Sequence, residues 1–181
     1  MAWTAPMTAV ANSIFTAAQF NTNVRDNLNE TAPAKAVNAG GYFVTTGVNA
    51  IAERTAGGDF VNASETTAST SFVDLATPGP AITKTTGTSA FVAVYGLVSI
   101  DTAGSSAVMS FAVSGATAVA ASDTRSVTFQ PGSVAAARSL RASAVTLLDG
   151  LTPGSNIFTA KYRVTGGIGT FNNRRIAVYP L

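Results

Sequence analysis

Short apolar runs rich in β-branched and aromatic residues recur along the C-terminal part of the sequence, and they constrain the fold more than any other feature. About eight such runs lie between residues 70 and 181, and turn residues such as Gly, Pro, Asp and Asn separate them. No helical pattern intervenes. This spacing is typical of an antiparallel β-sandwich or jelly roll. The expected strands are 71–75, 81–85, 90–100, 107–113, 125–129, 140–148, 156–164 and 175–178.

The expected strand 156–164 shows the clearest period-2 pattern. Phe158, Ala160, Tyr162 and Val164 alternate with more polar neighbours. Successive side chains of a strand point to opposite faces of the sheet. We therefore expect one side of this strand to be buried and the other to face outward.

The N-terminal residues 1–32 contain the only convincing helix signal. Thr16 is the predicted N-cap, and Gln19 completes a capping box with it. Phe15 before the cap and Phe20 within the first turn can form a hydrophobic staple. Pro33 is expected to stop the helix.

An apolar stripe on this helix predicts an anchoring role for residues 1–32. Phe20, Val24 and Leu28 lie on one face, together with Ala17. An isolated helix of this length is marginal in water, so the stripe needs a partner surface. That surface is the protein's own sheet, sister helices around a symmetry axis, or a host particle. The expected anchoring residues are Trp3, Phe15, Phe20, Val24 and Leu28.

Residues 33–69 form the expected spacer between the helix and the sandwich. The segment is rich in Gly, Ala, Thr and Asn and contains two Gly-Gly pairs, at 40–41 and 57–58. Its two short apolar islands are too small to build a core. We expect an extended arm that runs along a surface, followed by the β-sandwich domain at 70–181.

The residue composition argues against an enzyme. The chain has no His and no Cys, which removes Ser-His-Asp and Cys-His catalytic arrangements, zinc clusters and disulfides. No two of the nine acidic residues share a predicted strand at short spacing. The glycine-rich segment 166–170 lacks the Lys and the following helix of a phosphate loop, so it is expected to be a turn. We therefore expect no catalytic, cofactor or metal site.

The distribution of charged and apolar residues argues against a nucleic-acid-binding protein and against a membrane-spanning protein. Only 11% of the residues are charged, against about 25% in a typical chain. The basic residues are scattered, without the clustered face of a nucleic-acid binder. The longest apolar run, 90–98, is far shorter than the ~20 residues of a membrane-spanning helix. The start of the sequence lacks the pattern of a signal peptide, so folding in the compartment of synthesis is expected.

The adjacent pair Arg174-Arg175 is the one candidate for contact with a surface ligand. Two neighbouring guanidinium groups would suit an anion or a glycan carboxylate. The alternative is a pair at a strand edge that faces solvent or a neighbouring subunit.

Two segments of the sequence resemble a known family. The opening Trp3-Thr4-Ala5-Pro6 and the segment 15–28, FTAAQFNTNVRDNL, resemble the N-terminal signature of small tail and virion proteins of actinobacterial-type siphophages. The closing segments 150–164 and 169–178 are similar to the last strands of phage jelly-roll domains of the tumour-necrosis-factor-like shape. The resemblance implies a virion location and a homotrimer, and it covers about a third of the chain.

Three functional interpretations remain open from the sequence. The first is a trimeric tail-tip or fibre protein that displays its sandwich and contacts the host surface. The second is a capsid decoration or head-fibre protein, whose extended arm clamps neighbouring capsomers. The third is a glycan-binding or glycan-cleaving module on the same sandwich. The expected partners are other copies of the chain, other virion proteins and a host cell-surface glycan.

Overall fold

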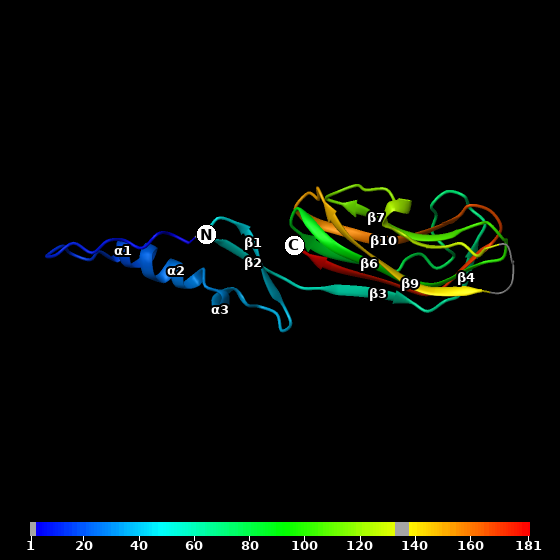
Figure 1. The fold of residues 1–181 in the computed structure, drawn as a ribbon. Coiled ribbons are helices and arrows are strands. Elements are labelled where there is room, and N and C mark those ends of the chain that lie inside the picture. Colours follow the sequence, from blue (N-terminus) through cyan, green and yellow to red (C-terminus); the bar gives the residue numbers. More distant parts are fainter. Residues whose placement is uncertain (1–2, 133–137) are drawn as a thin grey trace. The chain divides into compact units, whose positions relative to one another are not determined.

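The computed structural model describes residues 3–132 and 138–181, and the chain forms two compact units, Met1–Thr55 and Ala56–Leu181 (Figure 1). The spacer expected at 33–69 is therefore divided between the two units. Its first part joins the helix in the first unit. Its last part adds strands to the sandwich, where Gly58 allows a close approach to the backbone of Ile176.

The first unit combines a helical segment with a β-hairpin. The helix begins at the expected N-cap, Thr16, and the capping box with Gln19 is formed, with backbone-to-side-chain distances of 2.9 and 3.2 Å. The Phe15 and Phe20 rings meet edge to face at 6.1 Å, as expected for the staple. The elements of this unit are α1 (Ala17–Phe20), the π-helical turn η1 (Asn21–Arg25), α2 (Asp26–Asn29), α3 (Ala32–Lys35), β1 (Tyr42–Gly47) and β2 (Ala50–Arg54).

Pro33 does not act as the helix stop that the sequence predicted. The helix ends at Asn29, and Pro33 lies in the first turn of the next short helix, α3. The amide groups of a first helical turn need no partner inside the helix, so a proline is tolerated there.

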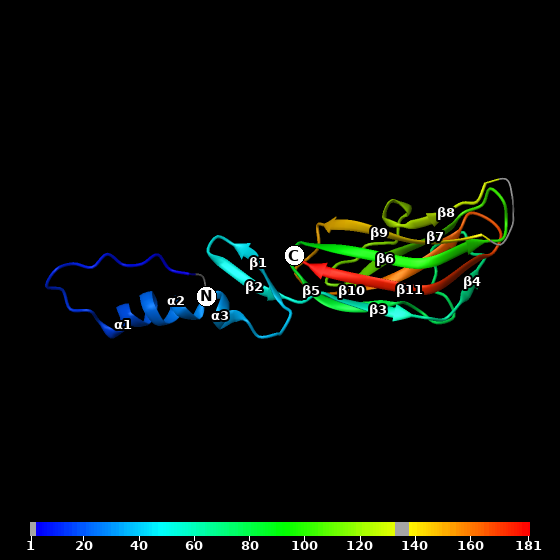
Figure 2. The same cartoon turned by 60° about the horizontal axis from the view of Figure 1, so that its bottom comes forward.

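The second unit is the predicted antiparallel β-sandwich. One sheet has the strand order β3-β11-β6-β9, and β4 also pairs with β11; the other sheet has the order β5-β10-β7-β8 (Figure 2). The strands are β3 (Gly57–Val61), β4 (Glu65–Thr67), β5 (Ala81–Thr86), β6 (Ser89–Ile100), β7 (Ala107–Gly115), β8 (Val127–Phe129), β9 (Ser139–Asp149), β10 (Gly154–Val164) and β11 (Gly169–Pro180). A short 3-10 helix, η2 (Asp123–Arg125), precedes β8.

Two expected strands differ from the observed elements. Residues 71–75 form no strand, and only Val73 makes an isolated bridge, to Tyr162 of β10. The strand expected at 125–129 is shortened, because its first residue ends the helix η2. The alternation expected along 156–164 is confirmed, since Phe158, Ala160 and Tyr162 are fully buried.

The hydrophobic core lies between the two sheets of the second unit. It is built mainly from the inward faces of β6, β11, β7 and β10, and it includes Val127 of β8, Leu148 of β9 and the loop residues Leu75 and Leu151. The first unit has nothing comparable. Among its described residues, Asn27 alone is buried. The two units thus differ in kind: one has a packed core and the other has almost none.

Candidate functional site

Arg174 lies inside the sandwich, so the expectation that it contacts a surface ligand is wrong for this residue. Its side chain is fully buried. Its guanidinium donates to the Glu65 carboxylate at 2.9 Å and to the Thr77 carbonyl at 3.3 Å, and it stacks over the Tyr162 ring at 5.3 Å. Arg174 therefore holds β4, through Glu65, and the segment that follows β4, through Thr77, against the core.

A β-bulge in β11 explains why Arg174 points inward. The pairing of β11 with β6 shifts between Asn172 and Arg175, and Asn173 has a positive φ of 49°. One extra residue at this point reverses the alternation of side chains along the rest of the strand. Opposite the bulge, Gly96 of β6 has no side chain, and a Cβ there would lie 3.1 Å from the Met109 Sδ and 4.0 Å from the Arg174 Cα.

Polar contacts of the buried cluster shift the pKa values of Glu65 and Tyr162. Hydrogen bonds from the Thr77 hydroxyl and amide, with the charge of Arg174, lower the pKa of Glu65. Burial raises the pKa of the Tyr162 phenol, which donates to the Gly79 carbonyl at 2.7 Å. Each of the two groups therefore has a structural partner.

Asp123 and Asp74 of the sandwich are also held by structural contacts. Asp123 binds Arg163 at 2.6 Å, which lowers the pKa of Asp123, and Asp74 binds Lys161 at 2.7 Å. Among residues 3–132 and 138–181, no group of three or more acidic side chains is placed to hold a metal ion. In the same residues, no helix is long and apolar enough to span a membrane.

Arg175 points outward, as expected, and belongs to an exposed face of the β3-β11-β6-β9 sheet. Paired residues of neighbouring strands share a side, so the register places Phe60 beside Arg175, and Arg175 beside Tyr95. The same rule aligns Tyr179 with Phe91. We call this surface the aromatic face; its members are Phe60, Arg175, Tyr179, Phe91, Tyr95, Val145 and Leu147.

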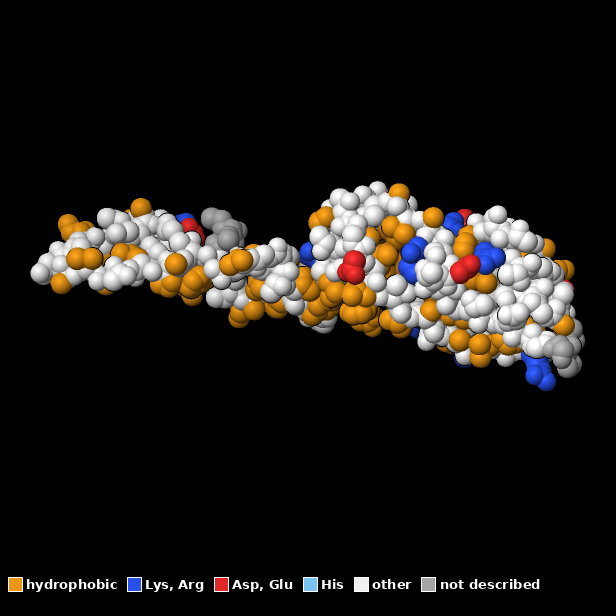
Figure 3. Space-filling model, turned by 45° about the horizontal axis from the view of Figure 1, so that its top comes forward, with side chains coloured by type: hydrophobic (Ala, Val, Ile, Leu, Met, Phe, Trp, Pro, Cys, Tyr) orange, Lys and Arg blue, Asp and Glu red, His pale blue; other side chains and the backbone are white. Residues whose placement is uncertain are grey.

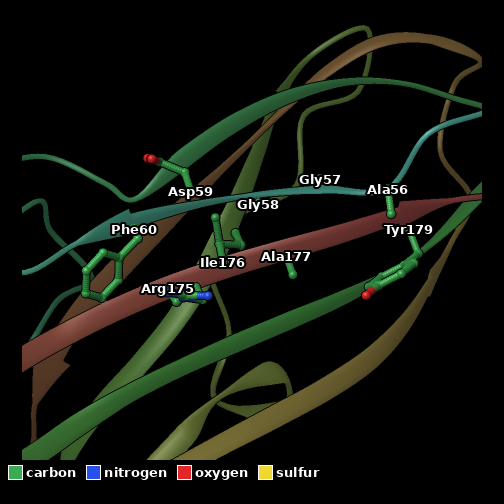
Figure 4. Close-up of a pocket in the computed structure, with 9 residues that line it drawn as sticks. All are labelled: Ala56, Gly57, Gly58, Asp59, Phe60, Arg175, Ile176, Ala177 and Tyr179. Atoms are coloured by element: carbon green, nitrogen blue, oxygen red, sulfur yellow. The ribbon is translucent and has the colours of Figure 1, made fainter. Parts of the chain in front are cut away.

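A groove of about 620 Å³ lies along one side of the aromatic face. Figure 4 shows Phe60 and Arg175 at one end and Tyr179 at the other, with the small residues Gly58 and Ala177 between them. The Arg175 guanidinium stacks on the Phe60 ring at 4.8 Å. No acidic partner of Arg175 occurs among the described residues.

The aromatic face is exposed and poor in charge. Val145 is 67% exposed, Tyr179 50%, Leu147 46% and Phe91 42%. The outward face of the other sheet is different, since Thr83, Thr159 and the ion-paired Lys161 lie on it. Large contiguous patches of exposed apolar surface are typical of contact sites between molecules.

The expected anchoring residues of the first unit form two separate groups. Trp3, Val24 and Leu28 line one apolar groove of about 240 Å³, together with Pro6. Phe15 and Phe20 pair with each other, at the start of the helix. Leu28 is 61% exposed. Hydrophobic side chains lie at the surface along the whole unit (Figure 3).

Asn27 holds the N-terminal arm on the helix, a role that the sequence pattern did not indicate. Its side chain accepts from the Thr4 amide at 2.8 Å and donates to the Thr4 carbonyl at 2.9 Å. These two bonds imitate the pairing of one strand with another. Asn27 thus makes the polar contact with the arm, and Phe20 and Leu28 of the apolar stripe remain exposed.

Comparisons with known proteins show a loose likeness of fold. Neither a family model nor a curated protein matches the chain. Two solved structures of infectious bursal disease virus, the Gx and Gt strains, match with TM-scores of 0.41 and 0.40 at 12% and 8% identity, covering 78% and 80% of this chain. Dimeric latent PorU from Porphyromonas gingivalis matches 67% of the chain with a TM-score of 0.34 at 16% identity.

The chain spans 36% of the length of each viral chain and 13% of PorU. A likeness this loose carries no conclusion about function.

Proposed function

We propose that the chain is a structural component of a tailed bacteriophage virion, in which the first unit anchors the protein and the β-sandwich is displayed. The observation that carries this proposal is the absence of a core in the first unit: Asn27 is its single buried residue among those described. The N-terminal sequence, which resembles that of phage virion proteins, lies within this unit.

The energetics of the first unit favour a partner. Fixing the backbone of one residue costs about 1–2 kcal/mol, and burial of apolar side chains normally offsets this cost. Here Trp3, Phe15, Phe20 and Leu28 remain 39–61% exposed. Each large apolar side chain contributes about 1.5–3 kcal/mol when a partner buries it. Insertion into a particle would supply the burial that the unit lacks.

The aromatic face suits contact between copies of the chain, and we propose a homotrimer. The same face carries complementary charges on β9, because Arg141 lies near one end of the strand and Asp149 at the other, both on the outward side. No ion pair or side-chain hydrogen bond joins the Asp149 carboxylate to another described residue. When two copies meet through this face, Arg141 of one copy can therefore pair with Asp149 of the other.

A tail-tip or fibre position is our preferred location in the virion. It rests on the N-terminal signature, which is associated with tail proteins. The alternative is a capsid decoration or head-fibre protein. The copy number per purified particle distinguishes them: a few copies in multiples of three favour the tail, and hundreds of copies favour the capsid.

Deletion of residues 1–32 tests the anchoring role. The shortened chain should remain soluble, because the core of the sandwich is untouched, and should be absent from purified particles. Leu28→Glu should reduce incorporation in the same way. Thr159→Glu, on the polar side of the sandwich, is the matched control. Full incorporation of the shortened chain would show that the anchor lies elsewhere.

A further inference from the structure

A second groove, of about 490 Å³, lies at the end of the sandwich opposite to the point where the chain enters from the first unit. The chain enters at β3, whose first residue, Gly57, pairs with Val178 near the C-terminal end of β11. The groove is at the other end of β11, where Gly169 pairs with Ile100 of β6. Its lining residues are Ser99, Ile100, Asp101, Arg138, Ser139, Ile168 and Thr170.

Three hydroxyl groups form a row across the floor of this groove. The register pairs Thr170 of β11 with Ser99 of β6, and Ser99 with Ser139 of β9. Side chains paired in this way stand about 4.5–5.5 Å apart on one face of a sheet. None of the three hydroxyls makes a hydrogen bond to another residue of the described chain. All three are free to donate to, or accept from, a ligand.

The groove also carries one cation and one carboxylate. Asp101 accepts from the Ile168 amide at 2.8 Å and from the Thr102 hydroxyl at 2.8 Å, and these bonds fix its orientation. Arg138 is exposed and has no acidic partner in the part of the chain that the structure describes. Ile168, 48% exposed, adds an apolar surface beside them.

We propose that this groove binds a saccharide, an assignment that rests on the proposed display of the sandwich on the virion and names a ligand class for it. Sugar hydroxyls both donate and accept, and they match a row of Ser and Thr hydroxyls flanked by a donor, Arg138, and an acceptor, Asp101. The C–H side of a sugar ring packs on Ile168. A free phosphate fits poorly, because the Asp101 carboxylate repels it.

Binding of defined oligosaccharides to the full chain tests the proposal. The probes are immobilised oligomers of glucose, of N-acetylglucosamine and of a uronic acid, and the best binder is then measured by calorimetry. The double variant Ser99→Ala/Thr170→Val removes two hydroxyls from the floor. Losing two hydrogen bonds should weaken binding about tenfold. Thr83→Val/Thr159→Val, on the outward side of the other sheet, is the control and should bind like the parent chain.

Two results would overturn the proposal: no binding of any of the three probes, or equal binding by the parent chain and the double variant. Neither result depends on the virion. Incorporation of the chain without residues 1–32 would instead overturn the anchoring role and leave saccharide binding intact. The two failures are therefore distinguishable.

Discussion

Glu65→Ala should destabilise the sandwich far more than loss of an exposed ion pair. The Glu65 carboxylate accepts from Arg174 at 2.9 Å, and from the amide and hydroxyl of Thr77 at 2.9 and 2.6 Å. Its removal leaves the fully buried Arg174 charge without a counter-ion. Breaking a buried pair by removing one partner typically costs about 3–5 kcal/mol.

Urea unfolding of the full chain, followed by far-ultraviolet circular dichroism of the sheets, measures this cost. The control is Asp74→Ala, which breaks the ion pair with Lys161; the two side chains are 41% and 24% exposed. An exposed pair contributes about 0–1 kcal/mol. If the two variants lose the same free energy of unfolding within about 1 kcal/mol, the buried cluster does not hold the sandwich together as described.

Three further predictions address acid stability, the arm and assembly. The folded state lowers the pKa of Glu65 below its ordinary 4.5, so the stability that Glu65 contributes is present above pH 4.5 and is lost as the pH falls through the folded pKa. The urea concentration at the unfolding midpoint should therefore decrease when the pH is lowered below 4.5, and it should decrease less steeply in Glu65→Ala. Asn27→Ala removes two bonds to the arm and should shift the emission of Trp3, the single tryptophan, to the red, whereas Asn29→Ala should not. Val145→Asp should lower the oligomeric state in sedimentation while the far-ultraviolet circular dichroism of the sandwich stays unchanged. A parent chain that is monomeric at micromolar concentration would contradict the assembly proposal.

The sandwich was predictable because its signals are local. Alternation along 156–164 and turn residues between apolar runs reflect the pleat of single strands, and the structure confirms both. The start of the helix was equally predictable from the sequence, since Thr16 and Gln19, which contact each other, are only three positions apart.

The burial of Arg174 was not predictable from the same patterns. Its partner Glu65 is 109 positions away in the sequence, and its direction depends on a single extra residue in β11. Asn173 and Gly96 were the available signals: asparagine tolerates a positive φ, and a glycine inside a strand often marks a close approach. Neither reveals which side chain fills the space.

Asn27 shows a second limit of sequence patterns. A helix was expected to use its apolar stripe for packing, yet a polar side chain makes the contact with the arm. The exposed part of the apolar stripe is buried only if another molecule covers it, and hydrophobic periodicity does not identify that molecule.

Hydrogen exchange measured by mass spectrometry, on the isolated chain and on purified particles, tests the central claim most directly. In the dilute isolated chain, amides of the helix Ala17–Asn29 and of the hairpin β1–β2 should exchange with little protection, while those of β6, β10 and β11 stay protected. In the particle both units should be protected. Protection of the first unit equal to that of β10 in an isolated monomer would contradict the account, because the unit would then need no partner.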